Sequence, residues 1–281
     1  RVNQTGNSLK ELGVELEQRI LLVLPDSPEF AFSFFGAIKI GAVPIPTNPW
    51  MKAKDYEYLL QDSRARILIV HESVLPEAEK IWDRSRFLKH VLVAGKPKGR
   101  ALSFESLVGK ASNRLEAEPT SKDDVVMWNY TSGSTGTPKG AVHLQHDMIT
   151  ITDLFAKPVL GMGEEDICFS ASKLFFSYGL GNSLYFPFRF GASSVLWPER
   201  PEPEKVLQVI QKYRPTFFFS VPTLYARLLR VEKKYDLSSI RICLSSGEPP
   251  PPPPLPLLGG KFCVPAPGVV GASGGAHEFF W

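Results

Sequence analysis

Short apolar runs alternate with helix-like segments along most of this chain, and this alternation most limits the folds open to it. The runs are rich in Val, Ile, Leu and Phe and are bounded by Pro, Gly, Asp or Ser, as buried strands are. Strands separated by helices at this spacing form βαβ units, which build parallel sheets covered by helices on both faces. We therefore expect an α/β fold with mainly parallel sheets.

The strand and helix series occurs twice, which predicts two βα subdomains. We place the first at residues 1–124, ending in a polar connection with a short helix near 104–111. We place the second at residues 125–248. The predicted strands are 19–24, 66–71, 90–95, 124–131, 141–144, 166–172, 193–198, 216–222 and 240–248.

Residues 249–281 differ from the rest of the chain. They hold 9 of the 25 prolines, and six of these are consecutive at 249–254. Such a run favours a polyproline II rod and is typical of ligands for SH3 or WW domains. It stands where the α/β series should continue, so a substituted or corrupted sequence end is the preferred interpretation. The chain opens on Arg1 rather than methionine, and we expect the fold to be incomplete at both ends.

Charge and composition exclude several classes of protein. The 281 residues carry a net charge of only +3, with scattered basic residues, so no nucleic-acid surface is predicted. The three cysteines are far apart and the five histidines show no HExxH spacing, so we expect no protein metal site and no disulfide. No apolar stretch is long enough to span a membrane, and no signal peptide is recognised. A cytoplasmic protein with no membrane partner is expected.

The segment YTSGSTGTPKG at residues 130–140 follows a predicted strand. Glycines let successive backbone N–H groups point into one concavity, while hydroxyls and one ammonium group add donors and positive charge, as phosphate binding requires. The segment lacks the Walker A order, because Lys139 is followed by Gly140 rather than Ser or Thr. A flexible linker is the alternative reading of this composition. The candidate phosphate-binding residues are Thr131, Ser132, Gly133, Ser134, Thr135, Gly136, Thr137, Lys139 and Gly140.

The order of residues in this segment resembles the phosphate-loop signature of the adenylate-forming superfamily, which includes acyl-CoA synthetases, firefly luciferase and peptide synthetase adenylation domains. The resemblance extends over residues 1–248. It is carried also by ELGVELEQRILLVLPDSPEFAFSFFGAIKIGAVPIPTNP, KLFFSYGLGNSLYFPFRFGASSVL, RPTFFFSVPTLYARLL and IRICLSSGE. These stretches are most similar to those of benzoate and 4-hydroxybenzoate CoA ligases. The implied fold is the amino-terminal domain of that superfamily.

The resemblance implies that the enzyme joins an aromatic acid to coenzyme A in two steps, with ATP and Mg²⁺. Thr131 and Lys139 then act in catalysis, and the loop holds the phosphates. The strand-end loop Ser246, Gly247, Glu248 and Pro249 lies against adenine, although an ordinary turn is the alternative. The implied acid pocket and CoA gate are Phe175, Phe176, Ser177, Tyr178, Gly179 and His277, of which the aromatic ones could equally form core.

The tail departs from the family pattern. The family's magnesium-binding glutamate falls on Gly274, which cannot coordinate a metal, and we assign no metal ligand. The ribose-binding aspartate and the carboxy-terminal domain would lie beyond residue 281, so we do not expect this chain alone to catalyse the full reaction. A ligase for fatty acids or for aryl carriers remains an alternative, as does a non-enzymatic proline-rich segment. The identity of the acid and the presence of a homodimer stay open.

Overall fold

The computed structural model describes residues 1–131, 136–246 and the backbone of residues 263–265. Within these, the chain divides into two compact units, residues 1–145 and residues 146–281, which are considered separately. The expected α/β fold with parallel sheets is confirmed in both. The predicted subdomain limits remain a prediction, and residues 125–145 group with the first unit.

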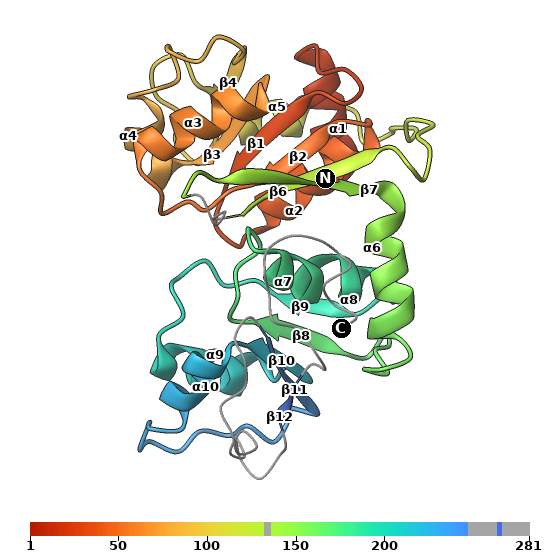
Figure 1. Ribbon diagram of the computed structural model, residues 1–281, viewed down its shortest axis with the longest axis vertical. Helices are drawn as coiled ribbons and strands as arrows, with labels where there is room; N and C mark the ends of the chain where they lie inside the picture. The colour runs from red at the N-terminus through yellow and green to blue at the C-terminus, as the bar shows by residue number, and fades with distance from the viewer. Residues whose placement is uncertain (132–135, 247–262, 266–281) are drawn as a thin grey trace. The chain divides into compact units, whose positions relative to one another are not determined.

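Unit 1 is built on a five-stranded parallel sheet in the order β2-β1-β3-β4-β5 (Figure 1). Its strands are β1 (Arg19–Val23), β2 (Val43–Pro46), β3 (Ile67–His71), β4 (His90–Ala94) and β5 (Leu102–Ser103). Its helices are α1 (Val2–Glu11), α2 (Pro28–Lys39), α3 (Ala53–Ser63), the 3-10 turn η1 (Glu72–Val74), α4 (Leu75–Ala78) and α5 (Phe104–Lys110).

Both faces of this sheet are covered, as its uninterrupted apolar strands require. Helices α3 and α4 pack on one face, where Leu59 and Leu60 join Leu21 and Leu68 in a buried cluster. Helices α1, α2 and α5 lie on the other side of the sheet (Figure 1). Helix α2 begins as its sequence predicts, because Pro28 occupies the first helical position and the Ser27 side chain accepts the Phe30 N–H.

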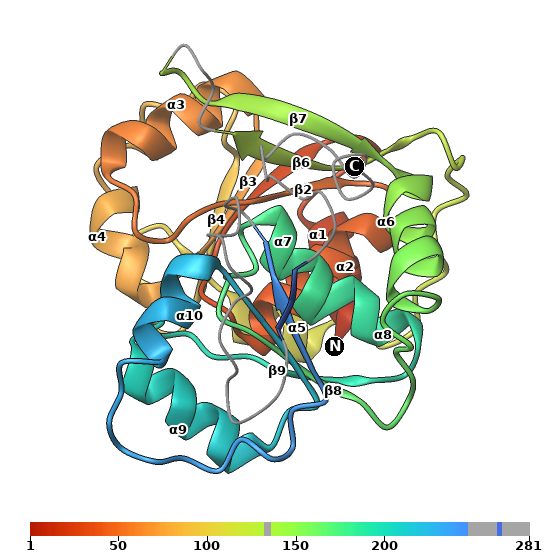
Figure 2. The same cartoon turned by 60° about the horizontal axis from the view of Figure 1, so that its bottom comes forward.

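A two-stranded antiparallel hairpin completes unit 1. It consists of β6 (Val125–Thr131) and β7 (Lys139–Leu144) and lies against β2 (Figures 1 and 2). The predicted strands at 124–131 and 141–144 are observed as β6 and within β7. They pair with each other, antiparallel, and among the described strands β6 pairs with no other, so the hairpin stands outside the parallel sheet. Trp128 and Tyr130 pack against the apolar cluster beneath α3, which explains why the hairpin belongs to unit 1.

Unit 2 contains a second parallel sheet in the order β12-β11-β10-β8-β9. Its strands are β8 (Ile167–Ser170), β9 (Ser193–Val195), β10 (Phe217–Ser220), β11 (Ile242–Ser245) and β12 (Cys263–Pro265). Its helices, which begin at the boundary with unit 1, are α6 (Gln145–Ile151), the π-helix η2 (Thr152–Ala156), α7 (Ser177–Leu180), the π-helix η3 (Gly181–Tyr185), α8 (Phe186–Arg189), α9 (Pro203–Tyr213) and α10 (Pro222–Leu228).

Helix α7 lies on one face of this sheet, and helices α9 and α10 lie on the other. Phe169 and Phe218 face α9 and α10 and form a core cluster with them. Phe219 lies on the opposite face, because successive side chains alternate along a strand, and it meets Tyr178 of α7. No helix in the described part of the chain is long and apolar enough to cross a membrane.

Candidate functional site

The β6–β7 hairpin carries the described part of the predicted phosphate loop. Tyr130 lies opposite Gly140, and Thr131 lies opposite Lys139. The antiparallel pairing therefore brings the first predicted phosphate ligand beside the predicted catalytic lysine, which is exposed to solvent. Ser132, Gly133, Ser134 and Thr135 lie outside the described residues.

Two glycines of the loop have a physical reason to be glycine. Gly136 has a φ angle of +83°, a conformation that side-chain-bearing residues rarely adopt. Gly140 lies under two aromatic rings, because a Cβ atom there would be 3.2 Å from Trp128 Cε3 and 3.5 Å from Tyr130 Cζ. The glycines thus allow one sharp bend and one close approach. Thr137, which the sequence also predicted to bind phosphate, is exposed.

Helix α3 makes a hydrogen bond to each end of this loop, a feature that sequence reasoning missed. The Tyr130 hydroxyl donates to Asp62 Oδ2 at 2.5 Å, and the Tyr58 hydroxyl donates to the Pro138 carbonyl at 2.8 Å. Burial raises the pKa of Tyr130, and the bond to Asp62 raises it further, so the phenol stays protonated at neutral pH. The spacing of Tyr58 and Asp62, one helical turn apart, was the available signal.

The predicted adenine loop is described only at its first residue. Ser246 follows β11 and is buried, and its backbone N–H donates to the Ser220 carbonyl at 3.2 Å. It therefore lies at the carboxyl ends of two neighbouring parallel strands, where open α/β sheets usually bind ligands. Gly247, Glu248 and Pro249 lie outside the described residues.

The predicted acid segment lies at the beginning of α7, on the face of the second sheet opposite α9 and α10. The ring centres of Phe175 and Phe176 are 4.5 Å apart. Phe175 is buried, whereas 53% of the Phe176 surface is exposed. Phe175 therefore fits the alternative reading as core, and Phe176 is free to meet a ligand. Ser177 is partly buried and begins the helix. His277 lies outside the described residues.

Tyr178 and Gly179 show how tightly this segment is packed. The Tyr178 hydroxyl donates to the Leu244 carbonyl at 3.2 Å, and its ring meets Phe219 edge to face. A Cβ atom on Gly179 would lie 2.2 Å from the Lys173 carbonyl oxygen and 2.4 Å from that of Ser172. Only glycine fits there. The π-helix η3 follows directly, and such helices are frequent at functional sites.

A buried lysine supports this segment and was not predicted. Lys173 is 3% exposed, its Nζ donates to the Trp197 carbonyl, and the same nitrogen lies 5.0 Å from the centre of the Trp197 ring. A buried ammonium group needs such partners, because burial without them is costly. The sequence signal is weak, since a single lysine before an aromatic run is more often exposed.

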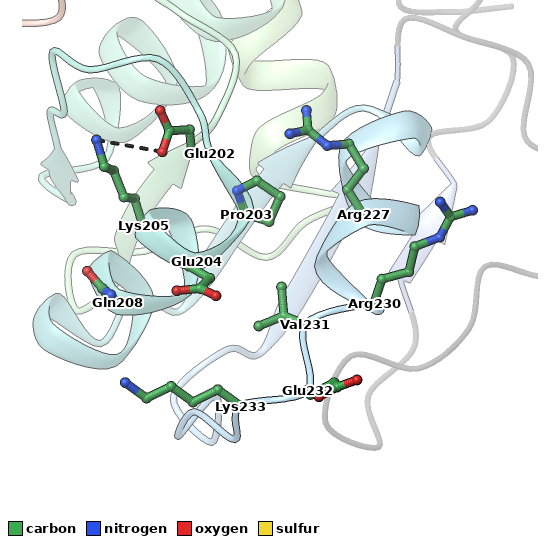
Figure 3. Close-up of a pocket in the computed structure, with 10 residues that line it drawn as sticks. All are labelled: Glu202, Pro203, Glu204, Lys205, Gln208, Arg227, Arg230, Val231, Glu232 and Lys233. Carbon is green, nitrogen blue, oxygen red and sulfur yellow. Dashed lines mark ion pairs between the residues drawn. The ribbon is translucent and has the colours of Figure 1, made fainter.

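One open groove of about 1100 Å³ lies between α9 and α10, but it matches none of the predicted sites (Figure 3). Its charged side chains are of both signs and include Arg227, Arg230 and Glu204. They point in different directions rather than toward one position (Figure 3). The groove therefore provides no convergent set of ligand groups. The described residues also contain no group of three His, Cys, Asp or Glu side chains able to hold a metal ion.

Comparison with known proteins identifies the family to which this arrangement corresponds. The family described as AMP-binding enzyme matches residues 1–269. A benzoate–CoA ligase of Thauera aromatica is 43% identical over 252 residues, which is 88% of this chain and 47% of that protein. A 4-hydroxybenzoate–CoA/benzoate–CoA ligase of Rhodopseudomonas palustris is 39% identical over 253 residues, 88% of this chain and 46% of that protein.

A solved structure of another CoA ligase is also similar to this chain. The crystal structure of the anthranilate CoA ligase AuaEII in complex with anthranoyl-AMP matches with a TM-score of 0.86 and 40% identity, and it covers 91% of this chain and 49% of that one. The chain thus spans about half the length of the curated relatives that it matches.

Proposed function

The chain belongs to the AMP-binding enzyme family, and from that premise we propose that it is part of an aromatic carboxylic acid CoA ligase. The ligase would activate benzoate-type acids with ATP and transfer them to coenzyme A. The single observation that carries the proposal is the 43% identity to a benzoate–CoA ligase over most of this chain. The pairing of Thr131 with Lys139 at the end of the hairpin gives it a structural basis.

The first step forms an acyl-adenylate. A carboxylate oxygen attacks the α-phosphorus of ATP, and the bond from that phosphorus to the bridging oxygen breaks, so that pyrophosphate leaves. Negative charge collects on the departing phosphates, and catalysis depends on positioning and charge stabilisation. In our proposal the Lys139 ammonium group and the Thr131 hydroxyl hold these phosphates, together with the loop glycines.

The second step transfers the acyl group. The thiolate of coenzyme A attacks the acyl carbon, the bond to the AMP oxygen breaks, and AMP leaves with the electron pair. We propose that the exposed ring of Phe176 lies on the thiol path, and that Tyr178 and Gly179 line the wall of the acid pocket. We expect an aromatic acid, because the Tyr178 ring, which packs edge to face on the buried Phe219, would give this wall flat apolar surface.

Mg²⁺ enters this proposal only as the companion of ATP, whose phosphate charge it neutralises when bound. The described residues do not offer a three-ligand site for it, so we derive no step through the metal. ATP and coenzyme A are both cytoplasmic metabolites, and we expect the enzyme to act there.

The test is acid-dependent exchange of pyrophosphate into ATP, measured on the gene product extended to the full length of its relatives. We expect exchange with benzoate or a hydroxybenzoate, and much weaker exchange with acetate. Preference for long-chain acids would replace the proposal with a fatty-acyl ligase. Exchange with no thioester formed from coenzyme A would favour an aryl-carrier ligase. Absence of exchange with any acid would contradict an adenylating enzyme altogether.

A further inference from the structure

The two ends of the phosphate loop are held by one helix. We propose that Tyr58 and Tyr130 are positioning residues of the nucleotide site, which keep Thr131 and Lys139 side by side through their bonds to Pro138 and Asp62. The inference rests on the proposed function, because it assumes that this hairpin binds the phosphates of ATP. It adds residues outside the loop motif to the machinery of that site.

The pattern of donors and acceptors joins helix and hairpin in both directions. Asp62 of α3 accepts a hydrogen bond from the last part of β6, and Tyr58 of α3 donates one to the residue just before β7. These two α3 positions are four residues apart and so lie on one face of the helix. The two bonds reach across 68 and 80 residues of sequence, which makes them tertiary restraints on the loop.

Helix α3 is a firm base for such restraints. Tyr56, Leu59 and Leu60 are each at most 1% exposed and pack into the apolar cluster of unit 1. The ring of Tyr130 packs against the same cluster and over Gly140. The hairpin end therefore cannot shift sideways without breaking either the packing or the two hydrogen bonds.

These restraints matter for binding because the groups they hold must converge. Thr131 and Lys139 directly adjoin the two anchored residues, and their pairing is the last rung of the hairpin ladder. Binding groups that are already held side by side lose less conformational entropy when phosphate binds. Losing one anchor should weaken ATP binding roughly fivefold, the equivalent of one hydrogen bond.

The first experiment removes only the hydroxyl groups. Tyr130→Phe and Tyr58→Phe keep the packed rings, and the double variant removes both anchors. The dissociation constants of MgATP and pyrophosphate are measured by titration calorimetry on the gene product extended to the full length of its relatives. We expect roughly fivefold weaker binding for each single variant and a larger loss for the double variant, with benzoate affinity unchanged.

Two controls separate positioning from general stability. Tyr56→Phe removes a hydroxyl group on the same helix that donates to the Asn48 carbonyl, at 3.0 Å, and not to the loop. This variant should leave the ATP affinity unchanged. Asp62→Ala should match Tyr130→Phe and add nothing to it, whereas Asp62→Asn keeps an acceptor oxygen and should restore most of the affinity.

The outcomes are distinct. If the wild-type full-length protein binds ATP and both Tyr→Phe variants bind it equally well, the positioning role is refuted while the proposed function stands. If the variants and Tyr56→Phe lose affinity alike, the effect is general destabilisation and the inference is again refuted. If the wild-type full-length protein binds neither ATP nor pyrophosphate, the proposed function itself fails, and the positioning role fails with it.

Discussion

The β6–β7 hairpin and the segment from Lys173 to Tyr185 both carry predicted ligand residues, yet they are built in opposite ways. The hairpin end is exposed at Lys139 and is fixed by two hydrogen bonds to α3, one donated by Tyr58 and one accepted by Asp62. The second segment is mostly buried and is fixed by close packing of its own backbone around Gly179.

The difference follows from the ligands that the two regions would bind. A phosphate chain is strongly hydrated, so its binding groups must be reachable from water, and the restraints that hold them lie behind the loop rather than around the ligand. An aromatic ring is bound by desolvated, well-packed walls. Substitutions in the hairpin should therefore change nucleotide binding with little effect on stability, and substitutions in the buried segment should do the reverse.

Gly179→Ala should have the largest effect on stability. The added Cβ would meet two backbone carbonyl oxygens at 2.2 and 2.4 Å, and backbone atoms cannot move aside as a side chain can. We expect a loss of about 3 kcal/mol in the free energy of unfolding, measured by chemical denaturation.

Gly163→Ala is the matched control in the same unit. No atom lies within 4 Å of the position that its Cβ would occupy, so the stability should change little. Equal stability of the Gly179→Ala and wild-type proteins would show that the segment is not packed as described.

Lys173→Met should have the second-largest effect on stability. The substitution keeps the length of the side chain but leaves the Trp197 carbonyl without this donor and removes the cation from the ring. We expect a loss of about 2 kcal/mol, seen in thermal and denaturant unfolding. Lys212→Met is the control, because this exposed lysine also lies over an aromatic ring, at 4.8 Å from the centre of Tyr213, and should cost little.

Asp166 should make the stability of unit 2 depend on pH. Burial alone would raise the pKa of this carboxyl group, but hydrogen bonds from Thr216, the Gly163 N–H and Arg241 outweigh it and lower the pKa below its ordinary value. The stabilisation is therefore present above about pH 4 and is lost as the pH falls through the folded-state pKa.

Asp166→Asn tests this dependence. We expect about 1–2 kcal/mol lower stability at pH 7 and a shallower loss of stability between pH 5 and pH 3 than in the wild type. Asp153→Asn removes an exposed ion pair with Arg189, and it should change the loss of stability between pH 5 and pH 3 less than Asp166→Asn does. If Asp166→Asn lost stability between pH 5 and pH 3 as steeply as the wild type, Asp166 would not be the source of this pH dependence.

Lys139→Met should have the smallest effect on stability and yet a clear effect on binding. The side chain is exposed at the start of β7, so the melting temperature should stay within a degree or two of the wild type. Pyrophosphate affinity should fall about tenfold, since one charge-assisted contact is lost. Unchanged affinity would remove this lysine from the site.

Much of the fold could be predicted because the signals are local. The strands at 19–24, 66–71 and 90–95 are apolar enough to be recognised within a few residues, and the structure places them adjacently in one sheet. The pattern VLPEAEKIWDRS at residues 74–85 favours one longer helix, but only η1 and α4 form before the chain turns. Its remaining apolar residues, Ile81 and Trp82, are buried without helical continuation.

The site could be predicted only where the motif itself carries the chemistry. The loop composition indicated phosphate, but the antiparallel partner of β6 depends on the packing of Trp128 and Tyr130 against residues distant in sequence. The anchors Tyr58 and Asp62 and the buried Lys173 depend on tertiary contacts in the same way. The helical spacing of Tyr58 and Asp62 was the one local signal, and exposed residues show the same spacing.

The most direct test of the account is to follow backbone amide signals of the isotope-labelled chain by NMR during titration with pyrophosphate and, separately, with benzoate. We predict that pyrophosphate shifts the signals of Thr131, Gly136, Lys139 and Gly140, and that benzoate shifts those of residues 175–180. If pyrophosphate left the hairpin signals in place, or shifted only signals elsewhere, the hairpin would not be the nucleotide site.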